Sequence, residues 1–160
     1  MRFRINHLIS STINLIREDF HAHRITLEIQ VEDDPTLNGD REEFAQAILN
    51  ILTNAKDTLL DRQTSTPKIS ITVRTEKGNA VVTIADNSGG IPEDVLGKIF
   101  QPYFSTKQPS RMKETGLSIS KTIIEKKMKG QLTAYNTTDG AEFRVEVRHV
   151  RYETSPCPSL

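Results

Sequence analysis

The sequence has a single cysteine, Cys157, and no long uninterrupted apolar run. One cysteine excludes an internal disulfide, which suits a protein of a reducing compartment. No stretch approaches the length that a membrane-spanning helix needs, and the first residues are not followed by the apolar core of a signal peptide. We therefore expect a cytoplasmic location and no membrane contact by these 160 residues, although a longer parent protein could be membrane-anchored.

The sequence also lacks an excess of charge of either sign, because 21 lysine and arginine residues balance 21 aspartate and glutamate residues. A broad basic surface is typical of nucleic-acid binding, so we expect no nucleic-acid partner. The length suits one domain with a sizeable core. We expect an N-terminal helix within residues 1–22, a main domain over residues 23–150 and a disordered tail over residues 151–160.

The residues between 41 and 60 show a helical pattern with two different sides. Apolar residues fall on one side at about 100° per residue. The other side carries a narrow polar stripe, formed by Gln46, Asn50, Asn54 and Asp57. Asn50 and Asn54 are one turn apart, so both can point at one ligand. Mg²⁺ takes one or two protein oxygens together with phosphates and water, so the stripe predicts a magnesium site, with a solvated helix face as the plain alternative.

A glycine turn follows the strand pattern AVVTIA of residues 80–85. Asp86 shares the parity of Val82 and Ile84, so its carboxylate leaves the strand on the buried face and needs a donor. The exocyclic amine of adenine is such a donor, whereas guanine presents a carbonyl there. Gly89 and Gly90 allow positive φ and a close approach of the backbone to a ligand. The alternative is an ordinary strand-exit turn.

The remaining patterns predict the fold. We expect helices over 5–20, 41–60, 92–100 and 116–128, with Asp40 as the N-cap of the second and Gly130 as the C′ residue of the last. We expect strands over 25–31, 36–38, 68–75, 80–85, 131–135 and 142–148. Together they predict an α/β two-layer sandwich, in which three helices cover one face of a mixed, mainly antiparallel sheet of about five strands.

Several motifs occur in an order that resembles the catalytic, ATP-binding domain of sensor histidine kinases. This wider group, with its Bergerat-type fold, includes DNA gyrase, the mismatch-repair ATPases and a heat-shock chaperone. NILTNAKDTL (50–59) looks like the N box, DNSGGIP (86–92) like the first glycine box DNGxGI, and IFQPYFSTK (99–107) like the F box. ETGLSIS (114–120) stands where the second glycine box, GTGLGL, belongs, and DGAEF (139–143) resembles the closing G-x-x-F strand. Ordered sets of motifs are far more specific than single ones.

The resemblance implies ATP and Mg²⁺ as ligands and gives the residues roles. Asn54 would bind Mg²⁺ and Asn50 would support the metal, which makes them the catalytic pair. Asp86 would select adenine, and Gly90 would let the backbone approach the base. Phosphate would be held by Lys107, Thr115 and Gly116, and the remaining predicted nucleotide contacts are Asp57, Ser88, Ile91, Tyr103, Phe104 and Leu117.

The γ-phosphoryl group would pass to a histidine of a dimerisation and phosphoacceptor domain, in the parent chain or its dimer mate, with a response regulator downstream. No histidine here is followed by an acidic residue, as the family's acceptor is. Residues 23–150 would then be the catalytic domain, and residues 1–22 the connection from a missing dimerisation domain. In the hydrolytic members of the group a glutamate occupies the place of Asn50, so an amide favours transfer over hydrolysis.

The second glycine box departs from the family pattern at two positions. Glu114 adds a negative charge where phosphates are expected, and Ser118 adds a side chain where the backbone should approach closely. One alternative is therefore a regulatory nucleotide-binding module with weak or no transfer. Another is a serine kinase of the anti-sigma type on the same fold. The plainest alternative is a structural α/β domain without a ligand.

Overall fold

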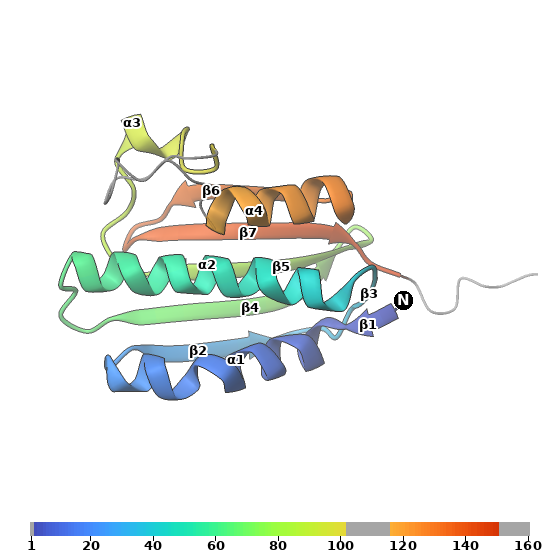
Figure 1. Cartoon of the computed structure of the whole chain (residues 1–160), viewed down its shortest axis with the longest axis horizontal. Helices are drawn as coiled ribbons and strands as arrows, with labels where there is room; N and C mark the ends of the chain where they lie inside the picture. The colour runs from blue at the N-terminus through green and yellow to red at the C-terminus, as the bar shows by residue number, and fades with distance from the viewer. Residues whose placement is uncertain (1, 102–115, 151–160) are drawn as a thin grey trace, which may run out of the picture.

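The computed structural model describes residues 2–101 and 116–150 (Figure 1). Predictions that fall on residues 102–115 and 151–160 lie outside this range. The helices are α1 (Ile5–Ala22), α2 (Arg41–Asp61), α3 (Glu93–Leu96), α4 (Gly116–Thr122) and the π-helical η1 (Ile123–Lys127). The strands are β1 (Arg2–Arg4), β2 (Thr26–Val31), β3 (Thr36–Asn38), β4 (Lys68–Glu76), β5 (Asn79–Asp86), β6 (Gln131–Asn136) and β7 (Ala141–Arg148).

The main sheet has five strands in the order β2-β4-β5-β7-β6. β2 and β4 are parallel, because α2 crosses over between them, and the other neighbours are antiparallel. α1, α2 and α4 lie side by side on one face of this sheet (Figure 1). The predicted two-layer sandwich is therefore confirmed. No pattern in the sequence predicts β1, which pairs with β3 in a small second sheet.

Alternation along β4 directs one row of side chains towards the helices, and β5 continues that row at Val82 and Ile84. Ile69, Ile71 and Val73 are fully buried, and Ile71 stands opposite Ile84 in the register. β5 ends at Asp86, which shares the parity of Ile84 and so faces the helical layer. The alternation thus places the Asp86 carboxylate on the face of the sheet that the helices cover.

α1 contributes to the same hydrophobic core as the rest of the chain. Its buried residues recur at helical spacing: Ile5, Leu8, Ile9, Thr12, Ile13, Ile16 and Phe20. The apolar members of this set form one continuous cluster with buried residues of α2 and of the main sheet. That this helix continues from a dimerisation domain stays a prediction.

The predicted helix over 92–100 is wrong in length, because α3 spans only Glu93–Leu96 and Pro92 is its N-cap. After Leu96 the backbone forms tight turns, in which Lys98 N–H donates to Val95 O at 2.8 Å and Gln101 N–H to Lys98 O at 3.0 Å. These three-residue turns replace helical bonds and let Ile99 bury its side chain in the core.

The helix over 116–128 forms, but it widens into a π-turn, in which Met128 N–H donates to Ile123 O at 3.0 Å. The predicted C′ position is wrong by one residue, since Lys129 takes the left-handed conformation with φ of 60°. Gly130 is required for space instead, because a Cβ there would overlap the carbonyl oxygen of Glu146 in β7.

Candidate nucleotide-binding site

A cavity of about 630 Å³ lies between α2, the glycine turn with α3, and the start of α4. This volume falls within the usual range for small-molecule sites. Its lining combines residues from all five quoted motifs with five residues outside them: Gln46, Leu49, Asn50, Thr53, Asn54, Asp57, Thr58, Asp61, Arg62, Ile91, Pro92, Val95, Ile99, Gly116, Leu117 and Phe143. The motifs that resemble a nucleotide pocket therefore meet in one concave space.

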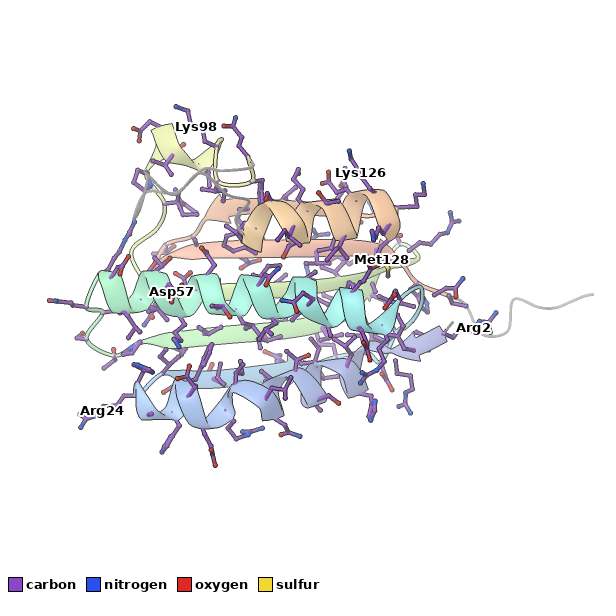
Figure 2. All side chains as sticks on the ribbon, viewed as in Figure 1. Arg2, Arg24, Asp57, Lys98, Lys126 and Met128 are labelled. Carbon is purple, nitrogen blue, oxygen red and sulfur yellow. The ribbon has the colours of Figure 1, made fainter. Side chains whose placement is uncertain are left out.

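The polar stripe of α2 forms one wall of the cavity. Asp40 caps the helix, since its Oδ1 accepts from the N–H groups of Glu42 at 3.0 Å and Glu43 at 3.1 Å. Asn54 and Asp57 are half-buried along this wall. Figure 2 shows Asp57 on the half of α2 that lies nearer to α3. The predicted stripe thus faces a cavity and not open solvent.

Asn50 joins this wall to the start of α4. Its Nδ2 donates to Gly116 O at 3.2 Å, and its Oδ1 accepts from Gln46 Nε2 at 2.8 Å. A Cβ on Gly116 would lie 3.3 Å from Asn50 Cβ, which explains a glycine at the tightest point between the helices. Residues 50 and 116 therefore come together as the two boxes of the resemblance require.

The serine that departs from the second glycine box is buried in the protein. Ser118 is only 5% exposed, and Ser120, two residues later, donates to Ala47 O of α2 at 2.8 Å. Ser118 therefore contributes to the packing of α4, which weakens one of the two reasons for expecting impaired phosphate binding. Glu114, the other reason, lies outside the described residues.

Asp86 is 7% exposed and is held by three donors that all reach Oδ1. Ser88 donates twice, from its hydroxyl at 2.7 Å and from its N–H at 3.0 Å. Ala141 N–H lies at 3.4 Å, on the strand that follows Gly140. The buried carboxylate is thus satisfied within the fold and oriented by named groups.

The residue after Asp86 has a structural role. Asn87 Oδ1 accepts from Lys68 N–H at 2.9 Å, and Asn87 Nδ2 donates to Thr66 O at 2.8 Å. These bonds tie the glycine turn to the beginning of β4. The asparagine of the DNSGGIP motif therefore fixes the turn to the sheet.

The turn itself depends on two glycines with positive φ, 103° for Gly89 and 98° for Gly90. A Cβ on Gly90 would lie 3.1 Å from Asn136 Oδ1. That amide holds the next residue at both ends: it accepts from Ile91 N–H at 2.7 Å and donates to Ile91 O at 2.8 Å. Asn136, at the end of β6, holds the glycine turn in place, and no motif of the sequence predicted this role. Whether Gly90 also lets the backbone approach a base stays a prediction.

Arg62 is a second missed residue, directly after α2. It lines the cavity, and its Nη1 donates to Ser88 O at 3.2 Å. The guanidinium also lies 3.5 Å from the position that a Cβ of Gly89 would take. No motif of the resemblance includes this position. A cation at the end of a helix is common, so its presence in the sequence does not predict a role in the site. Its contact depends on the turn returning to the helix end.

The oxygens of the α2 stripe fit a magnesium ion chemically. Asn50, Asn54 and Asp57 provide hard oxygen atoms on one cavity wall, and Mg²⁺ is bound by few protein oxygens when phosphates complete its shell. Within residues 2–101 and 116–150, no three histidine, cysteine, aspartate or glutamate side chains form a metal-binding group. The asparagines are therefore the ligands to test.

The root of the F box is described up to Gln101. Phe100 packs edge-on against Phe143, with ring centroids 6.0 Å apart, and Lys121 Nζ lies 4.9 Å from the Phe100 centroid. Lys121 also donates to Glu125 Oε2 at 2.9 Å, so the aromatic pair contacts the last helix, formed by α4 and η1, through Lys121. The predicted contacts Tyr103, Phe104, Lys107 and Thr115 lie outside the described residues.

Comparison with known families and proteins agrees with this geometry. Residues 39–151 match the family described as "Histidine kinase-, DNA gyrase B-, and HSP90-like ATPase". The two-component sensor PprA of Pseudomonas aeruginosa is 32% identical over 142 residues, which cover 84% of this chain and 15% of PprA. Sporulation kinase A of Bacillus subtilis is 31% identical over 121 residues, which cover 74% of this chain and 19% of that kinase.

The chain belongs to this ATPase family, and within it to the catalytic, ATP-binding domains of sensor histidine kinases. It spans less than a fifth of the length of PprA and of sporulation kinase A.

Solved structures show the same fold. The catalytic domain of histidine kinase ThkA superposes with a TM-score of 0.79 at 28% identity, and the match covers 92% of this chain and 95% of that domain. ThkA in complex with the response regulator protein TrrA superposes with a TM-score of 0.77 at 27% identity, over 94% of this chain and 42% of ThkA.

Among the described helices, none has the length and apolar character needed to cross a membrane.

Proposed function

We propose that this domain binds Mg²⁺-ATP in the cavity beside α2 and transfers the γ-phosphoryl group to a histidine on a partner phosphoacceptor domain. The observation that carries the proposal is the meeting of the N box and the two glycine boxes at one cavity. The asparagines of α2, the turn after Asp86 and the start of α4 line or adjoin the same space. The family's role as an ATPase or kinase domain supports ATP as the ligand.

Each part of the site has a distinct task in this proposal. Asp86 accepts a hydrogen bond from the exocyclic amine of adenine. Asn54, supported by Asn50, holds Mg²⁺, which would neutralise charge on the phosphates. Gly116 and Leu117 bring the start of α4 to the phosphate chain, where backbone N–H groups favour anions. Lys107 and Thr115 are proposed as further phosphate contacts.

The transfer breaks the bond between the γ-phosphorus and the β,γ-bridging oxygen and forms a P–N bond on the acceptor imidazole, and ADP leaves. Phosphoryl transfer is accelerated chiefly by positioning and charge stabilisation, so the site needs no strong base. Asn50 is an amide and cannot deprotonate a water molecule, which favours transfer to a side chain over hydrolysis. The acceptor domain would precede this one in the parent protein or its dimer mate.

A response regulator is the proposed downstream partner, since ThkA, which has the same fold, has been solved in complex with one. We also propose a cytoplasmic location for this domain, because ATP and response regulators are found there. The parent protein would supply any sensor or anchor.

Calorimetry on this chain and on Asp86→Asn tests the binding step. We expect ATP to bind more tightly with Mg²⁺ than without it, and the variant to lose at least tenfold in affinity. The amide replaces one acceptor oxygen by a donor, which faces the amine of adenine unfavourably. Absence of ATP binding to the wild type at millimolar concentration would refute the proposal.

Incubation with acceptor domains tests the transfer step. Labelled phosphate that is lost in acid indicates phosphohistidine, as we propose. An acid-stable label would instead indicate the serine kinase alternative. Tight ATP binding without labelling of any acceptor would indicate a regulatory nucleotide-binding module.

A further inference from the structure

Ser88 occupies the third position of DNSGGIP, where the DNGxGI form has glycine. Its side chain is 8% exposed, so it is a buried part of the turn. The hydroxyl donates to Asp86 Oδ1 at 2.7 Å, which is shorter than the 3.0 Å of the bond from the Ser88 N–H to the same oxygen. A glycine here would keep the backbone bond and lose the shorter one.

We propose that Ser88 is a positioning residue that sets the purine specificity of the site. It commits Oδ1 of Asp86 to the protein, so that Oδ2 remains to accept from the ligand. This inference rests on the proposed function, since it assumes that Asp86 recognises the base. It adds a residue whose effect passes through another side chain.

The orientation of the carboxylate decides what it can recognise. The Cβ–Cγ torsion of aspartate is broad, so a carboxylate without fixed donors can turn and present either oxygen. A carboxylate that can rotate about this bond can also accept hydrogen bonds from the N–H groups of other purines. A carboxylate fixed by donors accepts at one place, where adenine has an amine and hypoxanthine has a carbonyl that leaves both acceptors unpaired. Discrimination therefore depends on what holds Oδ1.

Ser88 is itself held from two sides, which makes it an effective anchor. Arg62 Nη1 donates to Ser88 O from the end of α2 at 3.2 Å. The next residue, Gly89, donates its N–H to Asp139 O in the β6–β7 hairpin at 3.0 Å. Gly140 then packs so closely on Asp86 that a Cβ there would lie 2.8 Å from Oδ1. These contacts fix the backbone of the turn from which the Ser88 hydroxyl extends.

The test compares ATP with inosine triphosphate, which has a carbonyl in place of the exocyclic amine. Calorimetry would give the ratio of the two affinities for the wild type, Ser88→Ala and Ser88→Gly. We expect both variants to lower this ratio about tenfold, which is the loss expected from one hydrogen bond to a charged group. Ser88→Thr restores a hydroxyl and should recover much of the preference for ATP.

Ser120→Ala is the matched control, because it also removes a buried serine hydroxyl that bonds to the protein. We expect it to lower the melting temperature and leave the affinity ratio unchanged. If Ser88→Ala does not fold, Ser88→Gly, which has the family's residue, provides the same comparison.

The outcomes separate the two proposals. A wild type that prefers ATP, with Ser88 variants that keep the same preference, would overturn the role of Ser88 alone. A wild type that binds neither nucleotide would overturn the proposed function and this inference together. A selective loss in the Ser88 variants, absent in Ser120→Ala, would support both.

Discussion

Gly140 shows at the scale of a single residue how closely the binding turn is packed. Its missing side chain leaves room for Asp86, because a Cβ would overlap the Asp86 carbonyl oxygen and lie 2.8 Å from Oδ1. The overlapped atom is backbone, so relief requires β5 or the β6–β7 hairpin to shift. We expect Gly140→Ala to lose about 1–3 kcal/mol of unfolding free energy and to weaken ATP binding.

Urea denaturation and calorimetry check this prediction, with Gly97→Ala as the control. A Cβ at Gly97 meets nothing within 4 Å, and its φ of −74° suits any residue. The control should stay within about 0.5 kcal/mol of the wild type. Equal effects of the two substitutions would contradict the packing described around Asp86.

Asn136 provides the second prediction at this scale. Its amide accepts from Ile91 N–H at 2.7 Å and donates to Ile91 O at 2.8 Å. The side chain thus makes the two backbone hydrogen bonds that a neighbouring strand would otherwise make, and so fixes this part of the cavity wall. Asn136→Ala should lower the free energy of unfolding by about 1 kcal/mol and should speed the exchange of the Ile91 amide hydrogen with solvent. Hydrogen exchange followed by NMR measures the second effect directly.

Asn14→Ala is its control, since Asn14 is exposed on α1, away from the turn. The control should leave exchange at Ile91 unchanged. Protection at Ile91 that survives Asn136→Ala would show that the turn is held by other contacts.

The residues proposed to bind the nucleotide and Mg²⁺ were easier to predict than the residues that hold the turn in place. Asp86 could be predicted because strand parity alone directs it inward. Asn50 and Asn54 could be predicted because helical spacing puts them on one face. Asn136 and Arg62 could not, because each acts on a backbone segment that is distant in sequence, and no spacing encodes such a contact.

At the scale of the element, the last helix, formed by α4 and η1, is attached to the sheet by a glutamate in η1. Glu125 Oε2 accepts from Lys121 Nζ at 2.9 Å and from Leu132 N–H at 3.1 Å, which ties η1 to β6. Burial raises the pKa of Glu125, but the hydrogen bonds from Lys121 and Leu132 outweigh it and hold the pKa below the ordinary value of 4.5. The ionised form is therefore favoured by folding.

This depressed pKa sets the direction of a pH dependence. The stability that Glu125 contributes is fully present above its unfolded pKa and is lost as the pH falls through its lower folded pKa. Glu125→Gln should therefore be less stable than the wild type at pH 6–7, and the gap should narrow below pH 4.5. Urea midpoints measured from pH 7 to pH 3 test this, and a gap that widens in acid would refute it.

Helix and strand patterns predicted where the main elements lie but not how two of them end. The predicted helix over 92–100 is shorter in the structure, because the backbone after Leu96 turns tightly and buries Ile99. The helix over 116–128 widened at Ile123, so that adjacent isoleucines Ile123 and Ile124 are both buried. Both outcomes depend on tertiary packing, which overrides a regular period.

For the whole molecule, alternation and motif order predicted the sandwich but left the strand order and β1 undetermined. The pairing of β1 with β3 joins residues 2–4 to residues 36–38, and a strand of three residues is too short to show a detectable pattern of its own. This pairing and the packing of α1 tie the N-terminal segment into the domain. The core therefore includes residues before 23, while the domain boundary at residue 23 stays a prediction.

Two neighbouring residues of α1 test whether the fold depends on this helix as a whole. Ile13 is fully buried in the common core, and Leu15 is 79% exposed on the same helix. Ile13→Ala should lower the free energy of unfolding by about 2–5 kcal/mol, because it leaves a cavity in the core. Leu15→Ala should leave the free energy of unfolding within about 0.5 kcal/mol of the wild type. Urea denaturation of the two variants gives the comparison, and both should unfold in a single transition if α1 and the sheet share one core. A separate early transition in Ile13→Ala would instead show that α1 is an appendage, as expected for a simple connection to another domain.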